Sequence, residues 1–377
     1  MADPTTVLAN AIARATNDLS TPIIAAEDIA GRVKYVARSA NRAGVRLLMA
    51  CALAKAVNPA VDIRKPYREL GGTDSYSGRN YDETYIASFI IEHDLPANST
   101  TAFLTPALRT KNVALMPNVK LGGTPQLLYT NAILLLNDVQ EGRVSAEDLL
   151  AETVRELLVL RKENRSRLNS LLDALRTTHG EDLLPLSSEA IVKLIGQHMA
   201  SPNASRLPVL VVAAAYQAAQ MNLGERVLTL QSHNAADEQT GALGDVEITI
   251  EGEDRVITSY EMKMKRVTLE DINRALQKIA GYSQRIDNYI FITTDVIEEQ
   301  VTRYAAEQYA RTGGTEITIL DCLSFLRHFL HLFHRLRTHF LEAYQSLLLA
   351  EPESAVRQEL KETFLTLRRA AETSDTL

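Results

Sequence analysis

Residues 244–267, GDVEITIEGEDRVITSYEMKMKRV, contain two segments in which apolar and polar side chains alternate. The first segment covers residues 245–250 and the second covers residues 255–267, with EGED between them. An alternation of period two is typical of a strand with one buried face, and a short connection containing Gly joins such strands into an antiparallel pair. The stretch therefore predicts a β-hairpin.

The hairpin places polar side chains of both strands on one face. Side chains alternate along a strand, so Glu261, Lys263 and Lys265 share a face. Asp245 begins the first strand, and pairing across the turn brings it near Glu261 and Lys263. Gly244, directly before it, allows close approach of a backbone or a ligand. Two carboxylates and an ammonium group are thus expected together.

Two neighbouring carboxylates raise each other's pKa unless a cation lies between them. Mg²⁺ prefers such oxygen ligands and accepts waters and phosphate oxygens as its remaining ligands. An adjacent lysine can orient a water or stabilise charge that develops on phosphate. An acid that opens one strand and E-x-K on the next form the PD-(D/E)xK pattern of nucleases, here with Gly244 in place of the proline. We therefore predict Asp245, Glu261 and Lys263 as catalytic residues, with Mg²⁺ bound by the two carboxylates.

The elements around the hairpin predict a mixed α/β unit with at least four strands. Residues 206–221, RLPVLVVAAAYQAAQM, have the composition of a buried helix. Thr268 begins a helix that runs to about Arg285, with Asp271 at the fourth position of a capping box. A strand, a helix and a further strand follow at 288–294, 295–311 and 315–320.

Acidic residues outside the motif are candidates for an accessory metal ligand. The loop 231–241, QSHNAADEQTG, is polar throughout and contains Asp237 and Glu238. Glu225, at the end of the preceding helix, is no better supported. The alternative interpretation of the loop is a simple connection between a helix and a strand.

The rest of the chain predicts helices. Residues 1–202 are expected to form a mainly helical region for DNA recognition, residues 203–322 the PD-(D/E)xK catalytic core, and residues 323–377 helices for packing or dimerisation. Long ordered loops are expected between residues 65 and 125. The N-terminal helices are expected at 9–19, 27–57, 83–93, 145–177 and 187–199. The overall class is α/β (α+β), a mixed sheet flanked by helices.

The net charge of −7 comes from 40 basic and 47 acidic residues and does not by itself indicate that the protein binds nucleic acid. The charge is unevenly spread, because residues 31–68 contain nine basic residues and one acid. Arg38, Arg42 and Arg46 recur every four residues and would line one helix face, suited either to DNA phosphates or to solvent. Four loop residues could reach base edges: Arg79, Asn80, Arg109 and Lys111.

Composition narrows the class of protein further. The 377 residues include only two cysteines, Cys51 and Cys322, which favours a reducing cytoplasm over a disulfide framework. No apolar run of about 18 residues and no signal peptide is visible, so neither a membrane nor secretion is expected. GGTDSYSG lacks the ending of a P-loop. Four histidines, His328, His331, His334 and His339, are interleaved with apolar residues and predict a packed or interface helix rather than a metal site.

Several stretches together resemble the SacI family of type II restriction endonucleases. They are GGTDSYSGRNYDETYIASFIIEHDLPANSTTAFLTPALR, LPVLVVAAAYQAA, QSHNAADEQTGALGDVEI, TSYEMKMKRVT and NYIFITTDVI. The resemblance extends from about Arg42 to Glu353 and implies Mg²⁺-dependent cleavage of double-stranded DNA at a short site, with a companion methyltransferase protecting the host. By position, it implies catalytic roles for Asp245, Glu261 and Lys263. The recognised site does not carry over.

Two other functions are consistent with the same residues. One is a different PD-(D/E)xK nuclease, specific for a DNA structure or a modification. The other is a DNA-binding protein that keeps the fold without cleavage, which the intact acids and lysine disfavour. A homodimer is expected on DNA, because two active sites related by a two-fold axis cut both strands most simply. Its candidate interface is the helix near residues 323–345.

Overall fold

The computed structural model describes residues 2–98, 100–178, 184–230 and 242–374. The chain divides into two compact units, Met1–Arg167 and Leu168–Leu377. We call them unit 1 and unit 2. Within the described residues, none of the helices combines the length and the apolar character needed to cross a bilayer.

Unit 1 is helical. Its helices are α1 (Pro4–Asn17), α2 (Glu27–Arg38), α3 (Ala43–Val57), α4 (Gly78–Tyr81), α5 (Ala87–Glu92), α6 (Gln126–Gln140) and α7 (Ala146–Thr178), the last of which runs on into unit 2. Helix α3 is buried along its length except at Lys55, because nearly all of its side chains are apolar and the other helices surround it. Leu8, Val36 and Leu136 belong to the same core.

The predicted helix over 27–57 is two helices, which corrects the prediction. The break falls at residues 39–42, where the Asn41 side chain accepts a hydrogen bond from the N–H of Ala43 at 3.0 Å and so satisfies the start of α3. The regular spacing of Arg38, Arg42 and Arg46 therefore does not describe one helix face. Helix α6 was not predicted, although residues 126–140 carry an apolar repeat.

Unit 2 contains a five-stranded mixed sheet, which confirms the mixed α/β class. Its strands, in spatial as well as chain order, are β1 (Glu225–Val227), β2 (Val246–Ile250), β3 (Val256–Lys263), β4 (Asn288–Thr293) and β5 (Glu316–Asp321). Strands β1, β2 and β3 pair antiparallel, whereas β3, β4 and β5 pair parallel. The predicted hairpin is thus confirmed, and the short strand β1 is an addition to the predicted four.

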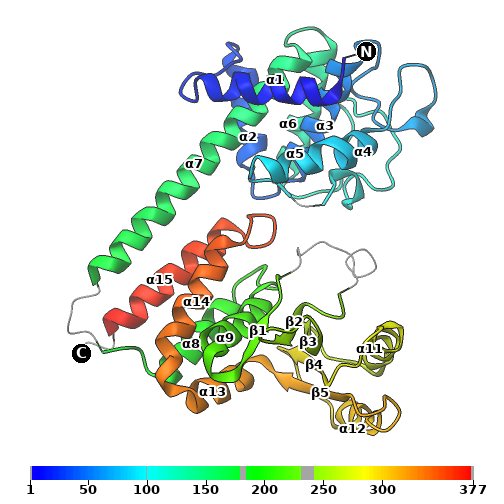
Figure 1. Ribbon diagram of the computed structural model, residues 1–377. Helices are drawn as coiled ribbons and strands as arrows, with labels where there is room; N and C mark the ends of the chain where they lie inside the picture. The colour runs from blue at the N-terminus through cyan, green and yellow to red at the C-terminus, as the bar shows by residue number, and fades with distance from the viewer. Residues whose placement is uncertain (1, 99, 179–183, 231–241, 375–377) are drawn as a thin grey trace. The chain divides into compact units, whose positions relative to one another are not determined.

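Helices cover both faces of the sheet (Figure 1). On one face, Val246, Tyr260 and Ile292 pack in a core with α8 (Ser188–Met199), α9 (Leu207–Leu223), α13 (Cys322–Leu332), α14 (Arg337–Ala350) and α15 (Gln358–Ser374). On the other, Tyr289 and Phe291 pack with α11 (Leu269–Gly281) and α12 (Glu299–Glu307). Since β3, β4 and β5 are neighbours in that order, two successive crossovers of one hand leave α11 and α12 on the same face.

Helix α8 packs against α13 and α15 and so lies within unit 2, although its residues fall in the range 1–202 assigned to the N-terminal region. The predicted capping box at the start of α11 is confirmed. The Thr268 hydroxyl accepts from the N–H of Asp271 at 3.3 Å, and the Asp271 carboxylate accepts from the N–H of Thr268 at 2.9 Å. This cap fixes where α11 starts relative to the end of β3.

Candidate functional site

The hairpin register brings the motif acids together. Val246 pairs with Tyr260, so Asp245, one residue earlier, faces the next position along β3. The backbone N–H of Met262 donates to Asp245 Oδ2 at 2.7 Å, which holds this carboxylate against β3 between Glu261 and Lys263. Gly244 is tightly enclosed: a Cβ there would lie 2.5 Å from the carbonyl oxygen of Tyr260. The predicted close approach is therefore that of the β3 backbone.

Glu261 is surrounded by donors. The Lys263 ammonium lies 3.1 Å from Oε1, and the Lys278 ammonium of α11 lies 3.1 Å from Oε2. The Tyr289 hydroxyl of β4 is a further donor to Oε2 at 3.2 Å, while lying 3.1 Å from the carbonyl oxygen of Leu243. The carboxylate is thus held in one orientation by contacts from three elements.

Lys263 is placed by two carboxylates. Besides Glu261, its ammonium contacts Asp271 Oδ1 at 3.4 Å. Burial tends to raise the pKa of Asp271, but the Thr268 hydroxyl and amide, together with the Lys263 charge, outweigh this and lower it. The capping residue of α11 therefore stays ionised and holds the motif lysine.

A further acid lies on the same sheet face. Glu247 pairs in register with Ser259, two residues before Glu261 on β3. Burial raises the pKa of Glu247, opposed by a hydrogen bond that its Oε1 accepts from the N–H of Leu243 at 2.7 Å. This carboxylate supports the turn before Asp245.

The donor set suits a hard divalent cation. Asp245 and Glu261 supply carboxylate oxygens at the carboxyl end of the parallel strands, where α/β sheets place their ligands. Mg²⁺ is commonly held by one or two carboxylates, with waters and phosphate oxygens completing its shell. Among the described residues there is no group of three or more His, Cys, Asp or Glu arranged for a metal.

A known protein family matches the segment of the chain that contains Asp245, Glu261 and Lys263. Residues 186–294 match the family model of the SacI restriction endonuclease C-terminal domain. This segment is similar to that family's C-terminal domain. No curated protein matches the chain.

The match confirms the resemblance to the SacI family over the segment that contains the hairpin, α8, α9, α11 and β4. A restriction endonuclease domain implies a nuclease, and therefore a hydrolase that binds DNA. The predictions of a nuclease and of DNA as its partner are confirmed at this general level. The quoted stretch at residues 71–109 lies outside the match.

Of the accessory acids, Asp237 and Glu238 lie outside the described residues. Glu225 does not join the SacI-domain site. It pairs with Ile250 at the turn end of β2, and it shares a sheet face with Val227, which packs against the core that contains Tyr260. Because side chains alternate, this face is opposite to that of Glu261.

The three predicted phosphate-binding arginines of unit 1 have protein partners. Arg38 contacts Glu163 at 2.7 Å and Glu156 at 3.2 Å. Arg42 donates to the carbonyl oxygen of Ala37 at 2.6 Å. Arg38 is therefore largely neutralised by carboxylates of α7.

The prediction that Arg46 lies on the surface is wrong. It is 1% exposed and pairs with Asp82 at 2.8 Å. Burial raises the pKa of Asp82, opposed by the Arg46 charge and by the Thr101 hydroxyl. Arg46 is thus a core ion-pair residue with no surface to offer a phosphate.

The predicted loop residues are more accessible. Arg79 and Asn80 are exposed on α4, where Arg79 contacts Glu83 at 2.8 Å. Arg109 is exposed and Lys111 is half-buried. Their role in DNA binding stays a prediction.

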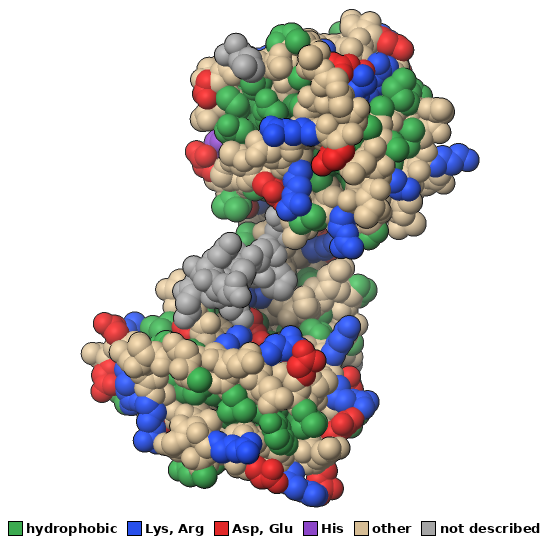
Figure 2. All heavy atoms as spheres, turned by 90° about the vertical axis from the view of Figure 1, so that its right-hand side faces the viewer, with side chains coloured by type: hydrophobic (Ala, Val, Ile, Leu, Met, Phe, Trp, Pro, Cys, Tyr) green, Lys and Arg blue, Asp and Glu red, His purple; other side chains and the backbone are tan. Residues whose placement is uncertain are grey.

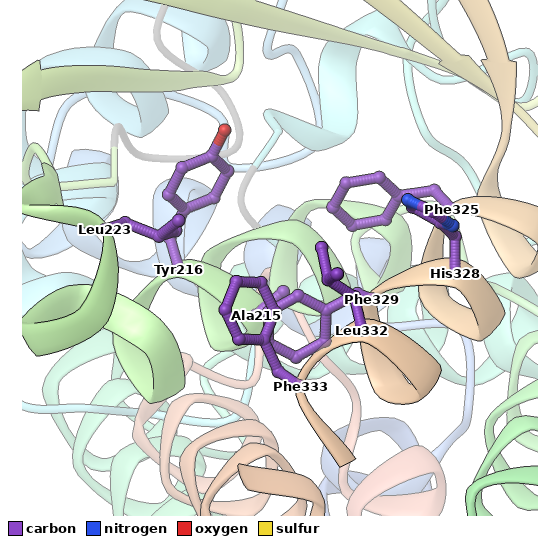
Figure 3. Close-up of a pocket in the computed structure, with 8 residues that line it drawn as sticks. All are labelled: Ala215, Tyr216, Leu223, Phe325, His328, Phe329, Leu332 and Phe333. Atoms are coloured by element: carbon purple, nitrogen blue, oxygen red, sulfur yellow. The ribbon is translucent and has the colours of Figure 1, made fainter. Parts of the chain in front are cut away.

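An apolar pocket of about 190 Å³ lies on the α9 side of the sheet (Figure 3). Its lining residues are Ala215, Tyr216, Leu223, Phe325, His328, Phe329, Leu332 and Phe333. The Tyr216 hydroxyl is 2.8 Å from that of Tyr260. Since Tyr260 and Glu261 point to opposite faces, this pocket is separate from the carboxylate site. All four histidines of this region are exposed, and His331 contacts Glu189 at 3.0 Å.

Sequence reasoning missed two members of the site, Lys278 and Tyr289. Lys278 lies on the α11 face that meets the sheet, which the apolar spacing of Ile272 and Ala275 could have indicated. On β4, the side chains of Tyr289 and Ile290 point to opposite faces of the sheet. Tyr289 and Phe291 form a buried aromatic pair, in which the Tyr289 hydroxyl is the polar group. Neither residue belongs to a short motif.

Proposed function

We propose that the protein is a type II restriction endonuclease, which hydrolyses phosphodiester bonds of double-stranded DNA at a short specific site with Mg²⁺ as cofactor. One observation carries the proposal. The Met262 N–H holds the Asp245 carboxylate at the strand end that also presents Glu261 and Lys263, as a PD-(D/E)xK core requires. The SacI-domain match over residues 186–294 supports it.

In this proposal Asp245 and Glu261 hold the cation. When bound, the ion supplies charge against the scissile phosphate and lowers the pKa of water. Lys263 orients the attacking water or stabilises negative charge on the phosphate oxygens, as a preorganised donor does. Asp271 keeps the Lys263 ammonium in place, and Tyr289 fixes the rotation of the Glu261 carboxylate.

We propose that unit 1 contributes DNA recognition through its loops. Arg79, Asn80 and Arg109 are exposed there, and arginine and asparagine are the side chains that read guanine and adenine most often. The proposed division places recognition in unit 1 and the catalytic core inside residues 203–322, whereas α8 belongs to unit 2 rather than to the recognition region.

We further propose that the enzyme works as a homodimer on DNA. Apolar side chains of unit 2 are exposed: Leu332, which lines the pocket, is 62% exposed and Met221 is 87% exposed. They are the best candidates for the surface between two copies. Leu332→Glu should lower the mass of the protein–DNA complex in light scattering. A wild-type complex of monomer size that breaks both strands in one binding event would contradict the dimer.

The direct test is to incubate the purified protein with a sequenced plasmid and Mg²⁺ and to map the fragment ends. Fragments ending at one recurrent short sequence are the expected result. Cleavage at branched or methylated DNA only would assign a different nuclease, and the absence of Mg²⁺-dependent cleavage on every substrate would contradict the proposal. A cytoplasmic methyltransferase encoded beside the enzyme is the expected partner.

A further inference from the structure

Glu261 carries two ammonium contacts, one on each oxygen. Lys263 reaches Oε1 and Lys278 reaches Oε2, both at 3.1 Å. All three side chains are largely shielded from solvent, so these contacts are stronger than those of surface pairs. A divalent ion that binds Oε2 of Glu261 therefore competes with the Lys278 ammonium and the Tyr289 hydroxyl for that oxygen.

The two lysines are held differently. Lys263 also pairs with the carboxylate of Asp271, at 3.4 Å. Lys278 also donates to the carbonyl oxygen of Leu243, at 3.4 Å. Moving Lys263 would leave two carboxylates without this cation, whereas moving Lys278 would leave Glu261 still paired with Lys263.

Helix α11 delivers both contacts from one face. Asp271 and Lys278 are seven residues apart, which is two helical turns and about 10.5 Å along the axis. The capping box fixes the first turn of the helix, so the position of Lys278 relative to β3 is set by the same element that holds Lys263. Figure 2 shows this side of unit 2, on which basic and acidic side chains are interspersed. The contact between Lys278 and Glu261 is therefore not part of a surface patch of one charge.

We infer that Lys278 is a positioning residue that acts as a resident cation. It keeps Glu261 oriented before a metal ion binds, competes with the ion for Oε2, and so sets the affinity of the site for divalent cations. The inference rests on the proposed function, because it takes Glu261 to be a metal ligand.

The test is a calorimetric titration of the full-length protein, free of DNA, with Mn²⁺. Lys278→Met keeps the length of the side chain and removes its charge. A like charge within about 4–6 Å shifts a binding equilibrium on the order of tenfold, so we expect Mn²⁺ to bind Lys278→Met about tenfold more tightly than wild type. Lys278→Arg should restore an affinity close to that of wild type.

Arg303→Met is the matched control, because it removes one positive charge from the neighbouring helix α12, where Arg303 pairs with Glu299 at 2.7 Å. Its affinity for Mn²⁺ should equal that of wild type. Thermal denaturation of each variant checks folding, and Lys278→Gln replaces Lys278→Met if the latter is unfolded. Unchanged or weaker binding by folded Lys278 variants overturns the inference. If wild type binds no Mn²⁺, or if Glu261→Gln leaves binding unchanged, the metal site itself is overturned, and the inference with it.

Discussion

Gly244→Ala would test how Asp245 is placed. A Cβ at this position would lie 2.5 Å from the carbonyl oxygen of Tyr260 and 2.6 Å from the hydroxyl of Ser259. Restoring an ordinary contact of 3.4 Å requires a movement of about 0.9 Å between the start of β2 and the middle of β3. Asp245 is the next residue, so its 2.7 Å hydrogen bond from Met262 would break.

We expect Gly244→Ala to lower the free energy of unfolding by about 1–3 kcal/mol, the usual cost of overpacking. Single-turnover cleavage should fall about a hundredfold, since a displacement near 1 Å of a reacting group has that effect. Denaturant unfolding followed by circular dichroism and cleavage at saturating Mg²⁺ measure the two effects.

Gly281→Ala, at the end of α11, is the control, because a Cβ there would meet no atom within 4 Å. It should leave cleavage unchanged and should not lower the free energy of unfolding, which Gly→Ala at a compatible backbone raises by about 0.4–1 kcal/mol. Adding Ser259→Ala to Gly244→Ala should restore only part of the stability, since the clash with the Tyr260 backbone remains. A Gly244→Ala protein as stable and as active as wild type would refute the placement of Asp245 against β3.

Burial lowers the pKa of His198 to about 4 from an ordinary 6.5, so the neutral folded state loses stability as pH falls from 6.5 towards 4. Denaturant unfolding should show a loss of about 3 kcal/mol over this range that is absent from His198→Gln, and equal pH profiles would contradict it. Arg46→Ala should destabilise unit 1 by about 3–5 kcal/mol, because Asp82 would stay buried without its cation; a loss under 1 kcal/mol in thermal or chemical unfolding would be inconsistent with this. Replacing Arg109 and Lys111 by alanine should flatten the slope of log K against log salt by about 0.9 for each phosphate contact removed, measured with Ca²⁺ in place of Mg²⁺, and an unchanged slope would exclude both from the DNA surface.

The parts of unit 2 that follow local rules were predictable. The hairpin, the capping box at Thr268 and the strand at residues 288–294 each have a signal within ten residues of sequence, and the structure keeps them. Strand β1 has only three residues, too few for an alternating pattern, and exists because it pairs with β2.

The candidate site also has residues that the sequence predicts and residues that it does not. Asp245, Glu261 and Lys263 come together because strand alternation and a tight turn fix their face. Lys278 reaches the site only through the packing of α11 on the sheet, which no spacing within the motif encodes. The prediction that Arg38, Arg42 and Arg46 line one helix face was wrong for a related reason. A new helix begins after Asn41, and Arg46 pairs with Asp82, which is 36 residues away in the sequence.

The central claim is that Asp245, Glu261 and Lys263 form the catalytic site, and Lys263→Ala tests it most directly. Lys265→Ala, two residues further along and exposed, is the matched control. At saturating Mg²⁺, Lys263→Ala should cleave DNA at least about a hundredfold more slowly than wild type, while its binding of DNA in Ca²⁺ and the activity of Lys265→Ala stay unchanged. Cleavage by Lys263→Ala at the wild-type rate would contradict the assignment of the active site.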